Sequence, residues 1–217
     1  TPPKLRALLS FNENEDLETK NLKSILGHFK FLRVLVLECK YMEGLPNEIG
    51  ELSNLSYFCL RGKHLKELPS SMGNLRNLLT LDVKRCVKIR LPPCIWKMEK
   101  LRHLLLNLYC EIIEDVVGLP NHLQTLSRID GQWIWPGLLR TFTNLRRLEI
   151  DRPTKEIMEV VSSSSDDDDD NAAPPVLEKL EYLKLGFNLH DENRRRWKLS
   201  GYKNLHKLKL HGRMRKL

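Results

Sequence analysis

Leucine recurs along this chain at a nearly constant interval, and that interval limits the possible folds more than any other feature. The phrase Leu-x-x-Leu-x-Leu, or a softer form of it, begins nine times in 217 residues. The first leucines of these phrases are Leu5, Leu32, Leu55, Leu78, Leu101, Leu123, Leu145, Leu180 and Leu205. Successive starts lie 27, 23, 23, 23, 22, 22, 35 and 25 residues apart. Such an interval indicates about nine stacked supersecondary units.

Each phrase predicts a short strand, because side chains along a strand alternate between its two faces. In residues 34–38, Leu35 and Leu37 therefore point inward, while Val34, Val36 and Glu38 point outward. One strand cannot bury its apolar face alone, so neighbouring units must share a continuous leucine core. This pattern is a leucine-rich repeat. We predict an α/β solenoid, a horseshoe with about nine repeats and a parallel, concave β-sheet.

The segments that return the chain to the next strand carry a second motif. Residues 45–52, 68–75 and 91–98 each begin with Leu-Pro and continue with apolar residues at matching positions. Proline fixes its dihedral angle and lacks an N–H group, so it ends strand pairing and turns the chain. The apolar residues that follow anchor a short return on the convex side. We expect these returns to be mostly irregular or 3-10 helical.

Two regions depart from this register. Residues 131–137 lack the Leu-Pro motif and contain Trp133 and Trp135. These tryptophans either fill the core of an irregular unit, which is the interpretation we favour, or form an exposed binding pair. The 35-residue interval contains a Ser/Asp-rich insertion at residues 162–173, which cannot bury apolar surface. We expect a disordered loop there, inserted in a single domain that spans residues 1–217.

The five cysteines do not form a disulfide framework or a metal-binding pattern. No Cys-x-x-Cys pair occurs, which argues against a zinc site. Cys39, Cys86 and Cys110 each fall shortly after a predicted strand, where a small apolar residue can face the core. We interpret them as buried, reduced thiols of a cytosolic protein and not as reactive groups.

The sequence assembles neither a catalytic site nor a cofactor site. The seven histidines are scattered, and His103 alone on a predicted strand is not an active site. The five aspartates at residues 166–170 are more typical of a solvated run than of a metal site. No run of about 18 apolar residues is present, so we expect no transmembrane segment. We therefore expect a non-catalytic protein with no cofactor or metal in these residues.

Binding of another protein is the function that the strands favour, because they display rows of outward side chains. The candidate residues on this face are Val34, Val36, Glu38, Tyr57, Arg61, Asp82, Lys84, His103, Leu105, Arg147, Glu149, Tyr182, Lys184, Lys207 and Lys209. The early rows are mixed and partly apolar, whereas the last rows are basic.

The basic charge is concentrated at one end of the chain. Residues 176–217 contain 12 basic and 4 acidic residues, which accounts for the entire net charge of +8. This charge is either only solvated or forms a surface for an acidic partner. Nucleic acid is not the expected partner, because the sequence has no groove-reading motif and no aromatic platform.

Several of these motifs together resemble one family. The Leu-Pro-x-x-Ile-Gly returns, the irregular unit lengths and the post-strand Cys86 are similar to those of plant nucleotide-binding, leucine-rich-repeat disease resistance proteins. Residues 4–11 look like the first strand after the nucleotide-binding module of that family, and residues 123–126 resemble another of its common phrases. The subclass with an N-terminal coiled coil is the most similar, and the resemblance covers essentially the whole chain.

The resemblance implies a fragment of a cytoplasmic immune receptor. In that family the repeat domain senses a pathogen effector or a guarded host protein, and it contacts the receptor's own nucleotide-binding module to hold the receptor off. ADP or ATP would bind in that missing module, because this chain has no Gly-x-x-x-x-Gly-Lys-Ser/Thr loop. The alternative is a stand-alone intracellular leucine-rich repeat scaffold of the Ras-group type, which has similar returns but more uniform units.

Deletion of residues 163–170 tests the interpretation of the Ser/Asp-rich insertion. A surface loop contributes to stability mainly through its closure entropy, which depends only weakly on length. We therefore expect the melting temperature to change by less than about 4 °C in differential scanning calorimetry. A larger loss, or a melting temperature that rises with added Ca²⁺ only in the intact chain, would show that the run is structured or binds a cation.

Overall fold

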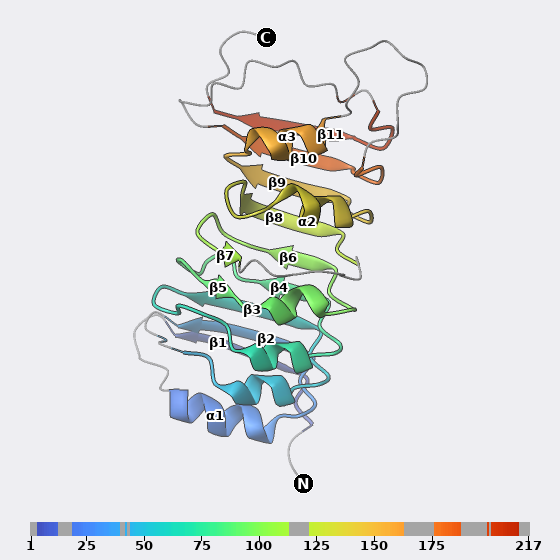
Figure 1. Ribbon diagram of the computed structural model, residues 1–217. Helices are drawn as coiled ribbons and strands as arrows, with labels where there is room; N and C mark the ends of the chain where they lie inside the picture. Colours follow the sequence, from blue (N-terminus) through green and yellow to red (C-terminus); the bar gives the residue numbers. More distant parts are fainter. Residues whose placement is uncertain are drawn as a thin grey trace. The chain divides into compact units, whose positions relative to one another are not determined.

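The computed structural model describes residues 4–12, 19–39, 42, 44–112, 122–162, 176–187, 199 and 201–212. The chain forms two compact units, residues 1–120 (unit 1) and residues 121–217 (unit 2). Both units alternate parallel strands with short helical returns, so each contains several copies of the same strand-and-return element (Figure 1). The predicted insertion at residues 162–173 lies outside the described residues, apart from Ser162.

Unit 1 is built on a parallel sheet whose strands follow one another in chain order. They are β1 (Ala7–Asn12), β2 (Val34–Cys39), β3 (Tyr57–Gly62), β4 (Thr80–Asp82) and β6 (His103–Leu105). The repeat leucines stay in register, since Leu8 pairs with Leu35, Leu35 with Phe58, and Leu81 with Leu104. Two shorter strands, β5 (Arg90–Leu91) and β7 (Glu111–Ile112), pair separately from this sheet. The strands predicted from the leucine phrases are confirmed.

The first described return of unit 1 is an α-helix, and the three returns that carry the Leu-Pro motif are 3-10 helices. Helix α1 (Thr19–His28) comes first, and the three 3-10 helices are η1 (Asn47–Glu51), η2 (Ser70–Asn74) and η3 (Pro93–Lys97). Pro46, Pro69 and Pro92 each occupy the N-cap with φ between -68° and -70°. Each proline carbonyl accepts a hydrogen bond, at 3.1 Å, from the N–H group three residues later. The prediction of 3-10 returns is confirmed for these three motifs.

The glycines of the Ile-Gly and Met-Gly pairs allow neighbouring returns to pack closely. A Cβ atom on Gly73 would lie 2.9 Å from Cβ of Cys94, and a Cβ atom on Gly50 would overlap the backbone of Ser71. Real Cβ atoms do not approach other atoms this closely, so any larger residue would push η1 away from η2 or η2 away from η3. The repeated glycine is therefore a requirement of packing between returns.

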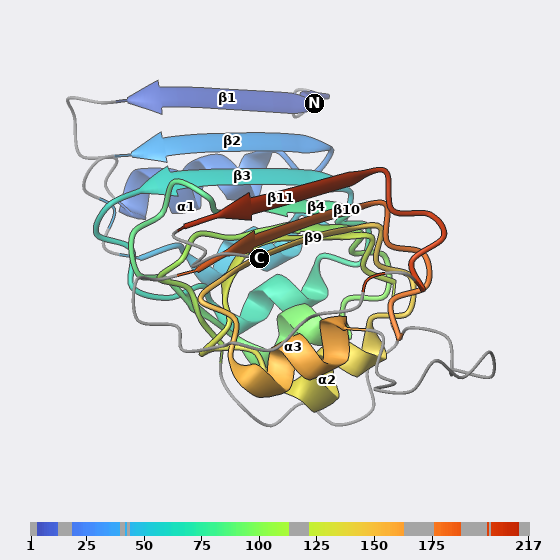
Figure 2. The same ribbon diagram turned by 90° about the horizontal axis from the view of Figure 1, so that it is seen from above.

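The strands of unit 2 also pair in a parallel sheet, and the described returns between them are α-helices. These strands are β8 (Thr125–Asp130), β9 (Arg147–Asp151), β10 (Tyr182–Gly186) and β11 (Lys207–His211). Helices α2 (Pro136–Thr141) and α3 (Lys155–Val161) lie side by side on one face of this sheet (Figure 2). Thr154 caps α3 by accepting a hydrogen bond from the N–H of Ile157. These two returns lack the Leu-Pro motif, and they are α-helices and not 3-10 helices.

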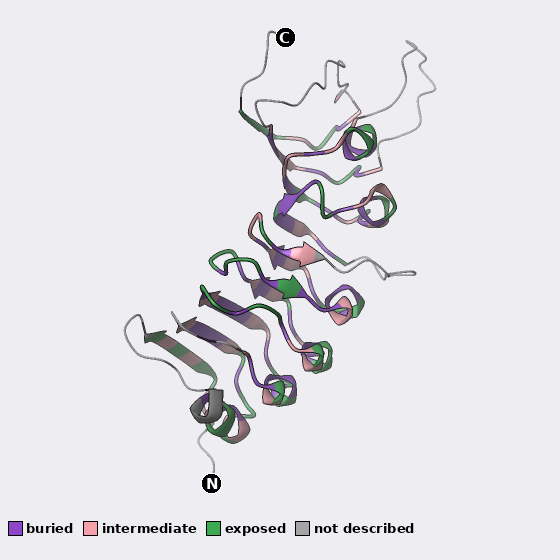
Figure 3. Ribbon diagram, turned by 60° about the vertical axis from the view of Figure 1, so that its left-hand side comes forward, coloured by how far each residue is buried: buried purple, intermediate pink, exposed green. Residues whose placement is uncertain are grey.

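The core of each unit lies between its strands and its returns (Figure 3). Inward leucines such as Leu35, Leu104 and Leu148 are fully buried. Leu208 and Leu210 keep register with Leu183 and Leu185 of β10, but they are 43% and 37% exposed. Strand β11 has a neighbouring strand on one side only among the described residues. This contrast shows that a leucine rung is buried only when repeats flank it on both sides.

The preferred interpretation of the tryptophans at residues 131–137 was wrong. Trp133 is 41% exposed and Trp135 is half-buried, so they do not fill the core. Ile134, which is 4% exposed, is the buried residue between them. The chain turns after β8 and is extended at Trp135, and Ile134 takes the inward position between the two tryptophans. The tryptophans stabilise the unit less than the sequence suggested.

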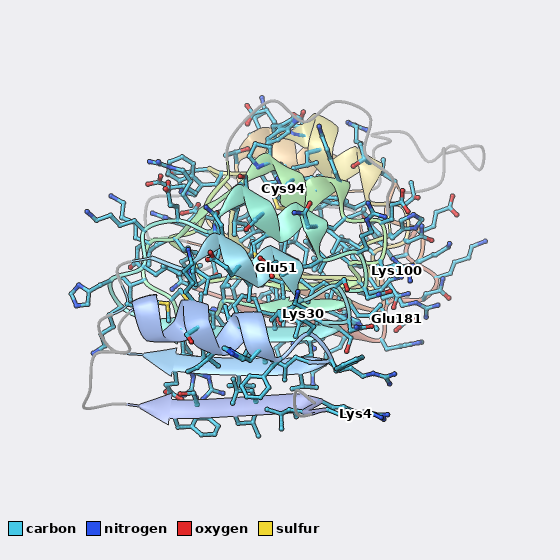
Figure 4. The ribbon with its side chains drawn as sticks, turned by 90° about the horizontal axis from the view of Figure 1, so that it is seen from below. Lys4, Lys30, Glu51, Cys94, Lys100 and Glu181 are labelled. Atoms are coloured by element: carbon cyan, nitrogen blue, oxygen red, sulfur yellow. The ribbon has the colours of Figure 1, made fainter. Side chains whose placement is uncertain are left out.

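A row of side-chain hydrogen bonds links consecutive repeats at the start of the strands. The residue just before the repeat leucine is Asn54, Asn77, Lys100, Asn144, Lys179 or Asn204. Asn54 donates to the carbonyl of Lys30 at 3.1 Å, and Asn77 donates to that of Ser53 at 2.8 Å. Lys100, labelled in Figure 4, donates to the side chain of Asn77 at 2.7 Å. Each bond spans one repeat, so these residues link neighbouring repeats.

Two of the three cysteines that were predicted to be buried are buried in the structure. Cys86 and Cys110 are buried, and the Cys86 thiol donates to the carbonyl of Leu60 in the preceding repeat at 3.2 Å. Burial raises the pKa of Cys86 to about 12 and that of Cys110 to about 11. Such thiols are almost entirely protonated near neutral pH, and the protonated form is a poor nucleophile. The side chain of Cys39 lies outside the described residues.

Iodoacetamide labelling at pH 8 provides a check on these thiols. Cys86 should react far more slowly in the native chain than in guanidinium, because a pKa of about 12 leaves about one thiolate in ten thousand. Half-buried Cys94 should be modified first in the native chain. Peptide mapping by mass spectrometry separates the two sites. Equal native rates at Cys86 and Cys94 would contradict the buried position of Cys86.

Substitution of adjacent leucines on β6 tests the strand register. Leu104 is fully buried and Leu105, on the opposite face, is half-buried. We expect Leu104→Ala to lower the free energy of unfolding by about 2–5 kcal/mol, since it leaves a cavity in the core. Leu105→Ala should lower it by less than about 1 kcal/mol. Urea denaturation measures both values, and an equal loss at the two positions would refute the register.

Candidate protein-binding surface

The outward side chains of the strands form a surface that we call the strand face, separately in each unit. In unit 1, strand pairing aligns Val34, Tyr57, Thr80 and His103 in one row. A second row aligns Val36, Cys59, Asp82 and Leu105. The predicted site residues of unit 1 therefore lie on one face, as the alternation indicated. Lys84 is the one predicted residue of unit 1 that does not lie on a strand, because β4 ends at Asp82 and Lys84 lies in the turn that follows.

Val36 contributes less to this surface than the sequence suggested. It points outward, but it is only 8% exposed, and its neighbour Cys59 is 2% exposed. Leu9 on one side and Cys59 on the other are in register with Val36, and together they cover it. A parallel sheet brings side chains of neighbouring strands within contact distance, so the residues on both sides shield Val36 from solvent. Val36 therefore packs between its neighbours and offers little contact area to a partner.

The charged side chains on the strand face of unit 1 are paired with one another. Arg61 donates to the carboxylate of Glu38 on the next strand at 3.0 Å, and this hydrogen bond raises the pKa of Arg61. Lys84 lies 3.5 Å from the carboxylate of Asp82. Opposite charges at this distance largely cancel each other's field toward solvent. The face of unit 1 is consequently mixed in character, with apolar positions between neutralised pairs.

Two large apolar residues on β1 belong to this face and were missed in the sequence analysis. Leu9 is 57% exposed and Phe11 is 62% exposed, and they lie in register with Val36 and Glu38 of β2. The signal was present, because the phrase that begins at Leu5 places residues 7, 9 and 11 outward by the same alternation. It was not used because that copy of the phrase is weak. Exposed Leu and Phe side chains are typical contact residues of protein interfaces.

The strand face of unit 1 also carries one histidine, His103. It is half-buried on β6, and burial together with the nearby charge of Arg102 lowers its pKa. Within the described ranges, no three His, Cys, Asp or Glu side chains are grouped so that they could hold a metal ion. The five aspartates at residues 166–170 lie outside those ranges. The arrangement on the strand face is therefore suited to noncovalent contact.

The strand face of unit 2 is organised around an aromatic ring. Arg147, Tyr182 and Lys207 are in register on β9, β10 and β11. The guanidinium of Arg147 lies 4.0 Å from the centroid of the Tyr182 ring, and the ammonium of Lys207 lies 6.0 Å from it. Both are within the range of cation–π attraction. Arg147 also donates from Nε to the carboxylate of Glu149 at 3.0 Å. The ring of Tyr182 and this carboxylate therefore both hold the Arg147 side chain in place.

Glu149 is a second predicted site residue that the structure buries. It is 7% exposed, and it lies beside an irregular part of β8 where the register shifts between Leu126 and Ile129. Arg128 at this bulge has φ of 59°, in the left-handed region. A bulge changes which side chain points outward, and it is not visible in a leucine count. Glu149 therefore acts mainly by holding Arg147.

A buried ion pair at the end of the strands was also missed. The carboxylate of Asp130 is fully buried, pairs with the guanidinium of Arg152 and accepts the N–H of Gln132 at 3.0 Å. Buried carboxylates need such partners, because desolvation otherwise disfavours their charge. This pair links the end of β8 to the residue that follows β9. No periodic pattern marks it, although two polar residues after adjacent strands are a usable signal.

Lys184, Lys207 and Lys209 form a compact basic group on the last two strands. Lys184 is in register with Lys209, and Lys207 lies two residues before Lys209 on β11. Lys184 is half-buried and the other two are exposed. None of the three forms an ion pair with a carboxylate in the described residues. The basic segment at residues 194–198 lies outside the described residues.

Comparison with known proteins agrees with the repeat architecture. The family described as leucine-rich repeat region matches residues 4–215. An Arabidopsis thaliana protein named as a disease resistance protein is 39% identical over 153 residues, which is 68% of this chain and 17% of that relative. Thus the chain spans about a sixth of the length of the curated relative that it matches.

A solved structure has the same fold. A leucine-rich repeat protein of Leptospira interrogans superimposes with a TM-score of 0.58 and 21% sequence identity, over 90% of this chain and 47% of that one. None of the helices in the described part of the chain is both long and apolar enough to cross a membrane. The register of the strands, the repeated returns and these matches lead to one assignment. The chain belongs to the leucine-rich repeat family, and its sequence is related to that of a plant disease resistance protein.

Proposed function

We propose that this chain is the recognition and autoinhibition region of an intracellular plant immune receptor. It would sense a pathogen effector or a guarded host protein, and it would contact the receptor's own nucleotide-binding module in the cytoplasm. The observation that carries this proposal is the 39% identity to a plant disease resistance protein over 153 residues. The strand face, with its rows of outward residues, supports a role in protein binding.

The strand face of unit 1 has the character of a protein-binding surface. Leu9 and Phe11 supply exposed apolar area, while Tyr57 and Leu105 are half-buried. Main-chain pairing holds these strands about 4.8 Å apart, so their side chains are positioned before a partner arrives. Little conformational entropy is then lost from the backbone on binding. The paired charges of Glu38 and Arg61 add polar contacts without a strong net field.

The other parts of the proposed receptor lie beyond this chain, which spans 17% of its relative. ADP or ATP would bind in the nucleotide-binding module, and no cofactor is assigned to these 217 residues. Nucleotide exchange there would be coupled to release of the contact made by the repeats. A protein is the proposed partner, and nucleic acid is not.

One observation favours a second function, a stand-alone intracellular scaffold of the Ras-group type. The three Leu-Pro returns of unit 1 recur at a uniform interval of 23 residues with nearly identical caps. The irregular unit 2, with its helices and its bulge, favours the receptor instead. The full-length gene decides between them: a Gly-x-x-x-x-Gly-Lys-Ser/Thr loop upstream supports the receptor, and its absence supports the scaffold.

The double variant Leu9→Glu/Leu105→Glu tests the proposed contact. Both side chains lie on the strand face of unit 1, and buried carboxylates in an interface are costly. We expect association with the receptor's separately expressed nucleotide-binding module, or with the effector, to weaken about tenfold or more in a quantitative pull-down. Val87→Glu/Tyr109→Glu is the matched control, because Val87 and Tyr109 are 48% and 59% exposed but lie outside the strands.

The two halves of the proposal give different results in leaves that express the full receptor. Loss of the autoinhibitory contact should cause cell death without a pathogen, whereas loss of the effector contact should abolish the response to the pathogen. The control variant should behave like the wild type in both assays. A double variant that associates and signals normally would refute a role for this face in either contact.

A further inference from the structure

We propose that Lys184, Lys207 and Lys209 form a docking site for an extended acidic segment of a protein partner. This inference deepens the proposed function, because it rests on the strand face being a protein-binding surface. It assigns the chemistry of one part of that surface, on β10 and β11. The partner residues are Asp or Glu side chains at alternate positions of an extended peptide.

The sheet places the backbone positions of the three lysines next to one another. Lys184 and Lys209 are register partners on adjacent parallel strands, which run about 4.8 Å apart. Lys207 and Lys209 are two residues apart on β11, and this corresponds to about 6.6 Å along the strand. Three positive charges at such spacings repel one another, and nearby carboxylates would relieve that repulsion.

The charges of these lysines are not neutralised as those elsewhere on the strand faces are. Arg61 pairs with Glu38, Lys84 pairs with Asp82, and Arg147 pairs with Glu149. Lys184 is the register partner of Glu149, but that carboxylate is bonded to Arg147 at 2.5 Å. The basic group is thus a part of the described strand faces where several positive charges lie together without a carboxylate partner. A partner with negative charge complements it.

The Tyr182 ring organises this surface and also limits what can bind there. Its ring attracts Arg147 and Lys207, which lie 4.0 Å and 6.0 Å from the ring centroid. Single-stranded nucleic acids bind mainly through bases stacked on open aromatic faces. The cations near this ring leave less of its surface for such stacking. The ring instead positions Lys207, which favours recognition of anionic side chains.

An extended acidic peptide matches the spacing of the lysines. Alternate residues of an extended chain project to the same side about 6.6 Å apart, which equals the separation of Lys207 and Lys209 along β11. Two carboxylates at such positions would meet both lysines, and one of them would also lie near Lys184. Such charge pairs mainly increase the rate of encounter and set the orientation of the partner, and salt weakens them.

The test uses the 217-residue chain and a fluorescein-labelled peptide in which the dipeptide Asp-Ser is repeated six times. The matched control peptide replaces each Asp with Asn. Fluorescence anisotropy measures binding in about 25 mM and about 150 mM salt. We expect the Asp peptide to bind more tightly at the lower salt concentration and the Asn peptide not to bind.

A triple charge reversal, Lys184→Glu/Lys207→Glu/Lys209→Glu, should weaken binding of the Asp peptide about tenfold or more at low salt. Its matched control reverses Arg140, Lys155 and Lys203, which lie on α2, at the start of α3 and in the turn before β11. Both variants change the net charge equally, so the control should retain binding within about twofold. The triple Gln variant at the same lysines replaces the Glu variant if that one does not fold.

Three results would overturn the site. One is equal weakening in both triple variants, which would show attraction by net charge alone. Another is wild-type binding that is absent or independent of salt. The third is preferential binding of an oligothymidylate that depends on the same lysines, which would indicate a nucleic-acid site. Because this assay requires no receptor signalling, its failure beside a successful pull-down refutes the lysine site and leaves the proposed function standing.

Discussion

The structure depends on burial of leucine between neighbouring repeats, because no single repeat has enough apolar surface to fold alone. Leu35, Leu104 and Leu148 are fully buried in rungs with strands on both sides, whereas Leu208, with one neighbouring strand among the described residues, remains 43% exposed. The free energy gained from this burial is roughly proportional to the apolar area removed from water. The parallel register, the packed returns and the outward rows all follow from keeping these rungs aligned.

Other interactions keep the rungs at their spacing. The Asn54 and Asn77 side chains bond to carbonyls of the preceding repeat, and Gly50 and Gly73 let the returns approach each other. Pro46 and its equivalents start each 3-10 helix at the same angle. These devices act at three levels of the repeat, namely the strand entrance, the return and its cap. Their agreement with the leucine pattern is what makes the fold specific.

The strands could be predicted because a leucine phrase reports directly on alternation, which is a local property of extended chains. The Leu-Pro returns were predictable for the same reason, since proline restricts its own backbone. The exposure of Trp133 was not predicted, because composition alone does not show which residue of an irregular segment points inward. The bulge in β8 and the ion pair between Asp130 and Arg152 depend on contacts between distant residues. Most candidate residues were placed on the right face, but burial of Val36 and Glu149 depends on the size and charge of their neighbours.

Alternation along each strand also separates two kinds of mutation. An inward change such as one at Leu104 alters the core of two neighbouring repeats, whereas an outward change at Thr80 or Leu105 alters only what a partner meets. Substitutions at the exposed positions of the outward rows can therefore accumulate with little loss of folding stability. A lineage that carries this scaffold can acquire a new binding preference one residue at a time, without passing through an unfolded ancestor. The binding surface can thus diversify because the two-residue period of the strand separates surface positions from core positions.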